Sequence, residues 1–208
     1  MYTLLKPIQA REKLLKKNIR IFTASEFMRI FHTSPHVTKY FLEKQVNEGL
    51  LSRLKQGIYA LKTDPPSEEE AANALYKPSY ISFEYALSYY HLLPEMPYTV
   101  TSATTKPTRL FSILSTSFSY RTIKKEAYTG YALVKQENRS FLIAEKEKAL
   151  IDYLYFVTLQ KIAGSERLLK NLKDKGYYRL QGLSKAKIND YVTLYANKRL
   201  TNFAASFI

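Results

Sequence analysis

Hydrogen-bonding side chains recur at helical spacing between residues 34 and 47, and they could do the chemistry of nucleic-acid recognition. Ser34 suits a helix N-cap because its hydroxyl can accept a bond from a free N–H, and Pro35 suits the first helical position. The outer face of this helix would carry His36, Tyr40, Glu43 and Asn47, flanked by Lys39 and Lys44. Such polar side chains can read base edges in a groove, and lysines can contact phosphates.

The opposite side of the same helix is predicted to face a core. Its stripe follows the spacing i, i+3, i+4, i+7 and i+8 and consists of Thr38, Phe41, Leu42, Gln45 and Val46. Gly49 is expected to end the helix in a left-handed conformation.

A shorter helix is predicted directly before this one. Thr23 and Glu26 have the spacing of a capping box, and Phe22 and Phe27 have that of a hydrophobic staple. Both signals indicate a helix from residue 24 to about residue 31.

A two-stranded hairpin is predicted after the second helix. Its strands are residues 50–54 and 58–61, and the loop Lys55-Gln56-Gly57 joins them. Helix, turn, helix and basic-tipped hairpin is the order of a winged helix-turn-helix, whose second helix enters the major groove. The alternative is that these elements form a domain that never touches DNA, with lysines that are only solvated.

The whole chain predicts an α+β fold with two domains. Residues 4–20 would form a first helix with Leu4, Ile8, Leu15 and Ile19 on its inner side. The proline-containing segment 63–66 separates residues 1–63, the winged helix-turn-helix domain, from residues 64–208. The second domain is expected to be mixed α/β, with a helix capped by Ser67. Its largely antiparallel sheet would use strands at 98–101, 110–113, 118–123, 131–134 and 140–143, and its other helices would lie at 82–92, 145–159, 165–175 and 184–198.

The charge distribution favours a polyanionic partner. The 208-residue chain has a net charge of +14 and a pI of about 9.7. Residues 1–64 hold 12 Lys and Arg against 5 Asp and Glu, and residues 65–208 hold 20 against 13, so each part carries +7. The shorter part is therefore the more densely basic, which favours nucleic acid, although membrane surfaces and ribosomes would also attract it.

The sequence lacks the residue patterns of most enzymes and metal sites. The chain has no cysteine, and without cysteine ligands His32, His36 and His91 do not make up a metal-binding set. No Walker-type or dinucleotide-binding glycine motif occurs. We expect no enzymatic activity, cofactor or metal. The enzymatic alternative is a nuclease or other enzyme. Glu84, His91 and Asp152 could form an acid–base site only if the fold brings them together. Without a signal peptide or a long apolar span, a cytoplasmic protein with no membrane partner is predicted.

Four segments resemble the AbiEi family of bacterial antitoxins. They read YISFEYALSYYHLLPE (80–95), YTVTSATTKPTRLF (98–111), FSYRTIKKEAYTGYALV (118–134) and SFLIAEKEKALIDYLYF (140–156). With the winged-helix pattern before them, the resemblance runs from about Phe22 to Phe156, and the segments 80–109 and 140–156 are the specific ones. The last fifty residues carry no matching motif.

This resemblance implies the antitoxin of a type IV toxin–antitoxin system, which is associated with abortive phage infection. The N-terminal domain would bind double-stranded DNA at inverted repeats in its own promoter and repress its operon. The C-terminal domain would counteract an AbiEii-like nucleotidyltransferase toxin, generally without a stable complex. The DNA contacts would map onto the helix from Ser34 and onto the hairpin at Arg53, Lys55 and Gln56.

The tyrosine content supports a second hypothesis. The chain has 18 Tyr and no Trp, and many of the tyrosines lie in the second domain. A tyrosine has an apolar body and a polar tip, so it suits interfaces as well as the edge of a core. The chain could therefore be a protein-interaction module that neutralises a toxin by direct binding, with DNA binding secondary.

Overall fold

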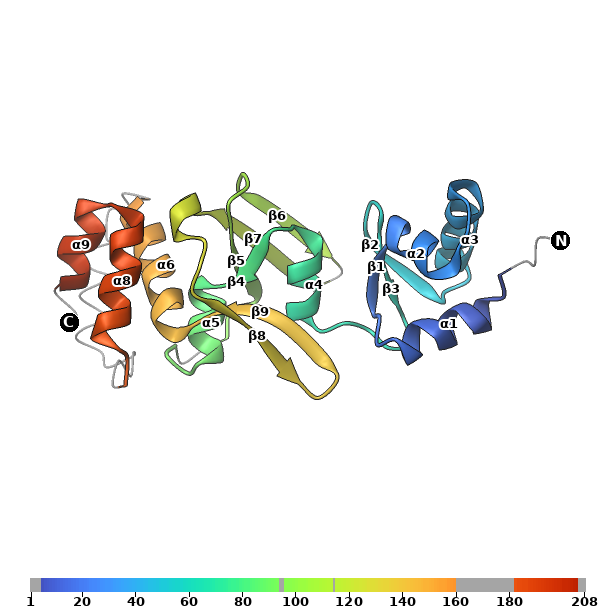
Figure 1. Cartoon of the computed structure of the whole chain (residues 1–208), viewed down its shortest axis with the longest axis horizontal. Helices are drawn as coiled ribbons and strands as arrows, with labels where there is room; N and C mark the ends of the chain where they lie inside the picture. The colour runs from blue at the N-terminus through green and yellow to red at the C-terminus, as the bar shows by residue number, and fades with distance from the viewer. Residues whose placement is uncertain (1–4, 94–95, 114, 160–181, 206–208) are drawn as a thin grey trace. The chain divides into compact units, whose positions relative to one another are not determined.

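The computed structural model describes residues 5–93, 96–113, 115–159 and 182–205 and has a mixed α/β architecture with two sheets (Figure 1). The chain forms two compact units. The first contains the residues up to Leu75 together with Lys135–Ser140, and the second contains Tyr76–Val134 and the residues from Phe141 on. The sequence placed the domain boundary after residue 63. The compact units instead change after helix α4 (Glu68–Leu75), which lies against strand β1 (Ile21–Thr23).

The first unit combines helices with a three-stranded antiparallel sheet of order β1-β3-β2. Its further elements are α1 (Pro7–Lys16), α2 (Ala24–Phe31), α3 (Pro35–Asn47), β2 (Leu51–Lys55) and β3 (Ile58–Leu61). Strand β1 was not predicted. Asn18 has φ +52°, so the chain has left the helical conformation before residue 21. The next residues extend and pair with β3, where Phe22 lies opposite Tyr59.

Helix α1 is shorter than predicted, and its buried side is different. Ala10 and Leu14 are each 1% exposed, whereas Ile8, which the sequence placed inside, is 61% exposed. Of the four predicted residues, Ile8 was wrong, Leu15 is partly buried against the core as predicted, and Leu4 lies outside the described residues. The helix ends at Lys16, so Ile19 packs against the core from the following loop instead.

The predicted start of α2 is confirmed in detail. The Thr23 hydroxyl accepts a hydrogen bond from the Glu26 N–H at 3.1 Å, and the Glu26 carboxylate accepts one from the Thr23 N–H at 2.7 Å. The rings of Phe22 and Phe27 lie 5.5 Å apart, centroid to centroid. This capping box and hydrophobic staple fix the start of the helix and the direction from which the chain enters it.

Both ends of α3 are also as predicted. The Ser34 hydroxyl accepts a bond from the Val37 N–H at 3.4 Å, and Pro35 occupies the first helical position. At the other end Gly49 has φ +85°, and the N–H groups of Gly49 and Leu50 bond back to carbonyls of the last helical turn. This Schellman-type end turns the chain directly into β2.

The second unit is built on a six-stranded sheet of order β6-β7-β5-β4-β9-β8, except for the ends of β8 and β9 within Lys135–Ser140, which belong to the first unit. The strands of the sheet are β4 (Ser79–Ile81), β5 (Thr99–Thr104), β6 (Arg109–Ile113), β7 (Thr116–Thr122), β8 (Tyr131–Gln136) and β9 (Arg139–Ala144). Five of the six were predicted to within a few residues. The central strand β4 was not, because its three residues are too few to show a period. The sheet is mixed, since β4 pairs with β9 and β5 with β7 in parallel.

The helices of the second unit stack outward from the sheet, and the first of them packs on β5. They are α5 (Phe83–Tyr89), α6 (Lys146–Leu159), α8 (Lys185–Tyr195) and α9 (Lys198–Ala205), and a 3-10 turn, η1, spans Lys125–Ala127. Helix α6 packs on α5 and α8, and α9 packs on α8 (Figure 1). The helix predicted at 184–198 corresponds to α8, which ends earlier because Ala196 has φ +40°; the separate helix α9 was not predicted. The helix predicted at 165–175 lies outside the described residues. None of the described helices has the length and apolar character that crossing a bilayer requires.

Candidate nucleic-acid interface

Helix α3 exposes one continuous polar side. All of the predicted contact residues on it are solvent-exposed: Ser34, His36, Lys39, Tyr40, Glu43, Lys44 and Asn47. Tyr40, near the middle, is 63% exposed. An α-helix with its side chains is about 10–12 Å across, which matches the width of the major groove of B-DNA, about 12 Å. The 13 residues of α3 give it a length of about 20 Å along the groove. The exposed side therefore has suitable dimensions for base readout.

The other side of α3 is held in the core of the first unit, as the predicted stripe requires. Thr38, Leu42 and Gln45 are each no more than 2% exposed, and the Phe41 ring stacks on Phe27 of α2 at a centroid distance of 5.4 Å. Val46, the fifth residue of the stripe, is partly buried. The rotation of α3 about its axis is thereby fixed, so the polar side stays outward.

The two lysines of the exposed side differ in their surroundings. Lys44 lies 3.7 Å from Glu48, one turn further along, and both side chains are half-exposed. Within the described part of the chain, Lys39 belongs to no ion pair. Lys39 is therefore the more available cation for a phosphate.

The hairpin after α3 presents only part of its predicted contact set. Arg53 and Gln56 are exposed, and Gln56-Gly57 forms the turn between β2 and β3 with Gly57 at φ +79°. Lys55 is half-buried, and its ammonium donates to the carbonyl oxygen of Leu75 at 2.8 Å. That carbonyl ends helix α4, where the helix dipole attracts a cation. A phosphate contact by Lys55 would have to use the remaining N–H donors of this ammonium or replace the bond.

The three candidate acid–base residues, Glu84, His91 and Asp152, have different surroundings. The Glu84 carboxylate makes a bidentate ion pair with Arg121 at 2.7 and 2.9 Å, and His91 is exposed. Asp152 is fully buried and has a separate set of partners. Among the described residues, no three His, Asp or Glu side chains are grouped so as to hold a metal ion.

A closed polar network surrounds Asp152 in the second unit, and the sequence did not reveal it. One carboxylate oxygen accepts bonds from Lys148 and Tyr195, and the other accepts them from Tyr80 at 2.9 Å and Ser82 at 2.7 Å. All five side chains are fully buried. Because a substrate cannot reach them, we interpret the network as a tie between β4, α6 and α8. The i, i+4 pair of Lys148 and Asp152 inside an apolar helix was the available signal.

The network also shifts the ionisation of its members. Burial lowers the pKa of Lys148 below its ordinary value, and the nearby Asp152 carboxylate opposes that shift. Burial and the same carboxylate raise the pKa values of Tyr80 and Tyr195 well above that of a free tyrosine. Both phenols are therefore neutral hydrogen-bond donors at ordinary pH.

Comparison with known proteins adds no relative from which a role could be inferred. The chain matches no protein-family model, and no curated protein is significantly similar to it in sequence. The resemblance to the AbiEi antitoxins stays a prediction from the segments quoted above.

Proposed function

We propose that the chain is a winged-helix DNA-binding repressor of its own operon that also serves as the antitoxin of an AbiEi-type system. Its partners would be double-stranded DNA with inverted repeats and, functionally, an AbiEii-like nucleotidyltransferase toxin in the cytoplasm. The observation that carries the DNA-binding part is the polar side of α3, which is exposed along its length above a buried stripe. The basic charge of residues 1–64 and the hairpin after α3 support it further.

Base readout and phosphate contact are assigned to different residues of α3. His36 and Tyr40 lie in the first turns, which is the part of a recognition helix that usually contacts base edges. Losing a base contact should cost about 1–3 kcal/mol at the matching base pair. Lys39 would contact a phosphate, so its loss should weaken binding to all sequences alike.

The test is a titration of duplex DNA from the promoter directly upstream of this gene. His36→Ala and Tyr40→Ala should weaken binding to that duplex and narrow its advantage over scrambled DNA. Lys16→Ala, on the exposed side of α1, is the control for the loss of a surface contact elsewhere. Unchanged affinity and unchanged preference in both α3 variants would contradict the proposal.

The antitoxin part is tested separately, in cells. We expect the neighbouring gene to encode a nucleotidyltransferase whose expression arrests growth, and this chain to restore growth when the two are co-expressed. Growth arrest that this chain leaves unchanged would contradict the antitoxin proposal and leave the DNA-binding proposal standing.

The direct-binding alternative is favoured by exposed large side chains of the second unit. Tyr98 is 99%, Leu110 67% and Leu133 54% exposed. The tyrosines that first motivated this idea argue less for it, because Tyr80 and Tyr120 are fully buried among other aromatic rings. Co-elution of the two gene products from a sizing column at high salt would favour direct binding, and separate elution would count against it.

A further inference from the structure

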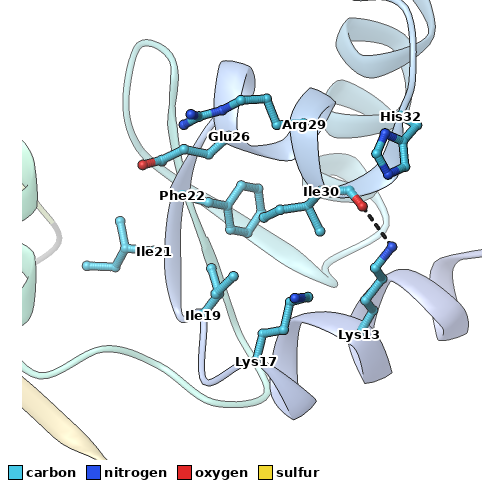
Figure 2. A pocket seen from close by; sticks show the side chains of 9 residues that line it. All are labelled: Lys13, Lys17, Ile19, Ile21, Phe22, Glu26, Arg29, Ile30 and His32. Carbon is cyan, nitrogen blue, oxygen red and sulfur yellow. Dashed lines mark hydrogen bonds between the residues drawn. The ribbon is translucent and has the colours of Figure 1, made fainter.

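A hollow of about 580 Å³ lies in the first unit, between helix α1, strand β1 and helix α2 (Figure 2). As Figure 2 shows, Lys13 and Lys17 reach into it from α1, and Arg29 and His32 border it from α2. This volume is within the range of about 300–1,000 Å³ that is usual for small-molecule sites. None of these four residues belongs to the proposed DNA contacts.

The floor of the hollow is apolar. It is formed by Phe22, Ile19 and Ile30, while Ile21 borders the hollow from the other side of strand β1 (Figure 2). Ile19 and Ile30 are only partly buried, so part of their hydrocarbon surface faces water at the bottom of a concavity. Covering such surface is favourable by about 25 cal/mol for each Å² removed from water.

Three cations and one carboxylate line the hollow: Lys13, Lys17, Arg29 and Glu26. Lys13 donates to the Ile30 carbonyl oxygen at 2.7 Å, and the Glu26 carboxylate accepts the Thr23 N–H in the capping box; these partners are neutral, so both groups keep their charge. No carboxylate in the described ranges pairs with the Lys17 ammonium or the Arg29 guanidinium, and both side chains are exposed. The hollow is therefore positively charged overall, and two of its cations have no ion-pair partner among the described residues.

We propose that this hollow binds a small organic anion. Lys17 and Arg29 would hold its carboxylate or sulfonate, and the isoleucine floor would cover its aromatic ring or branched chain. A nucleic-acid backbone is the less suitable occupant, because phosphates would use the two cations and leave the apolar floor in water. The site is independent of the proposed role of α3, so neither proposal depends on the other.

The experiment uses 8-anilinonaphthalene-1-sulfonate as the probe, on the full chain, with binding followed by fluorescence. Replacing both cations (Lys17→Gln with Arg29→Gln) should weaken binding by on the order of tenfold, since two charge-assisted contacts are lost. The matched control is Lys6→Gln with Lys16→Gln, which removes the same charge from α1 and its start but outside the hollow. Equal binding by the two double variants would overturn the proposal.

Three further measurements test whether the probe binds in this hollow. Backbone amide NMR shifts should be largest near Ile19, Ile21 and Ile30, and shifts confined to other regions would overturn the proposal. The uncharged analogue N-phenyl-1-naphthylamine should bind more weakly. Equal binding of the two probes would show that the cations do not contribute to the affinity. Inorganic phosphate should displace the probe poorly. Displacement as strong as that by an organic anion would show that the apolar floor does not contribute to the affinity. Thermal unfolding should show that both double variants are folded, because all four lysine and arginine side chains are exposed.

Discussion

Replacing Lys39 by glutamine removes one exposed cation from α3 without disturbing the buried stripe. Because Lys39 has no ion-pair partner among the described residues, the free energy of unfolding should change by less than about 0.5 kcal/mol. A plot of log K against log salt concentration has a negative slope for DNA binding. The loss of one phosphate contact should make this slope less steep by about 0.9. Between 50 and 200 mM NaCl the wild-type chain should therefore lose about 3.5-fold more affinity than Lys39→Gln.

The assay is fluorescence anisotropy of a labelled promoter duplex at several salt concentrations. Two other lysines provide the comparison. Lys44→Gln should change the slope less, since its ammonium is already close to Glu48. Lys55→Gln should instead lower the free energy of unfolding by about 1–2 kcal/mol, because it loses the bond to the Leu75 carbonyl. Identical salt slopes for wild type and Lys39→Gln would refute the assignment of Lys39 to a phosphate.

Three further predictions concern stability. Gly130→Ala should cost about 1–3 kcal/mol, since Gly130 has φ +73° and a Cβ there would lie 2.6 Å from the Tyr191 ring; an unchanged melting temperature would contradict this. Phe27→Ala should lower the free energy of unfolding, measured in urea, by about 3–5 kcal/mol, because Phe27 is fully buried among other rings. A decrease below about 1 kcal/mol would contradict the placement of Phe27 in the core. Tyr195 has a raised pKa in the folded state, so its contribution to stability is complete below pH 10 and is lost as the pH rises further. Absorbance at 295 nm should thus show buried tyrosines ionising only as the circular dichroism signal is lost, and full ionisation near pH 10 with an intact signal would contradict it.

The features that the sequence predicted well are those set by neighbours in the chain. The capping box of Thr23 and Glu26 and the start at Ser34-Pro35 involve residues no more than three apart. The glycine end of α3 is equally local, since Gly49 supplies a backbone conformation that other residues rarely adopt. With both ends and the buried stripe fixed, the exposed side of α3 followed from helical geometry alone.

The features that were missed depend on partners far away in the sequence. Strands β1 and β4 have three residues each, and their pairing partners, not their own pattern, make them strands. Lys55 was read as a wing cation, but the carbonyl that it bonds lies twenty residues further on. The hollow shows the same limit, because Lys17 and Arg29 come from different helices and only the fold brings them to one cavity.

The central claim is that the outer side of α3 is the surface that meets duplex DNA. The most direct test is an NMR titration of the ¹⁵N-labelled chain with the promoter duplex. The largest amide shifts are predicted from Ser34 to Asn47 and at the turn containing Gln56. Tight binding of the duplex with α3 shifts no larger than those of α8 and α9 would contradict the claim.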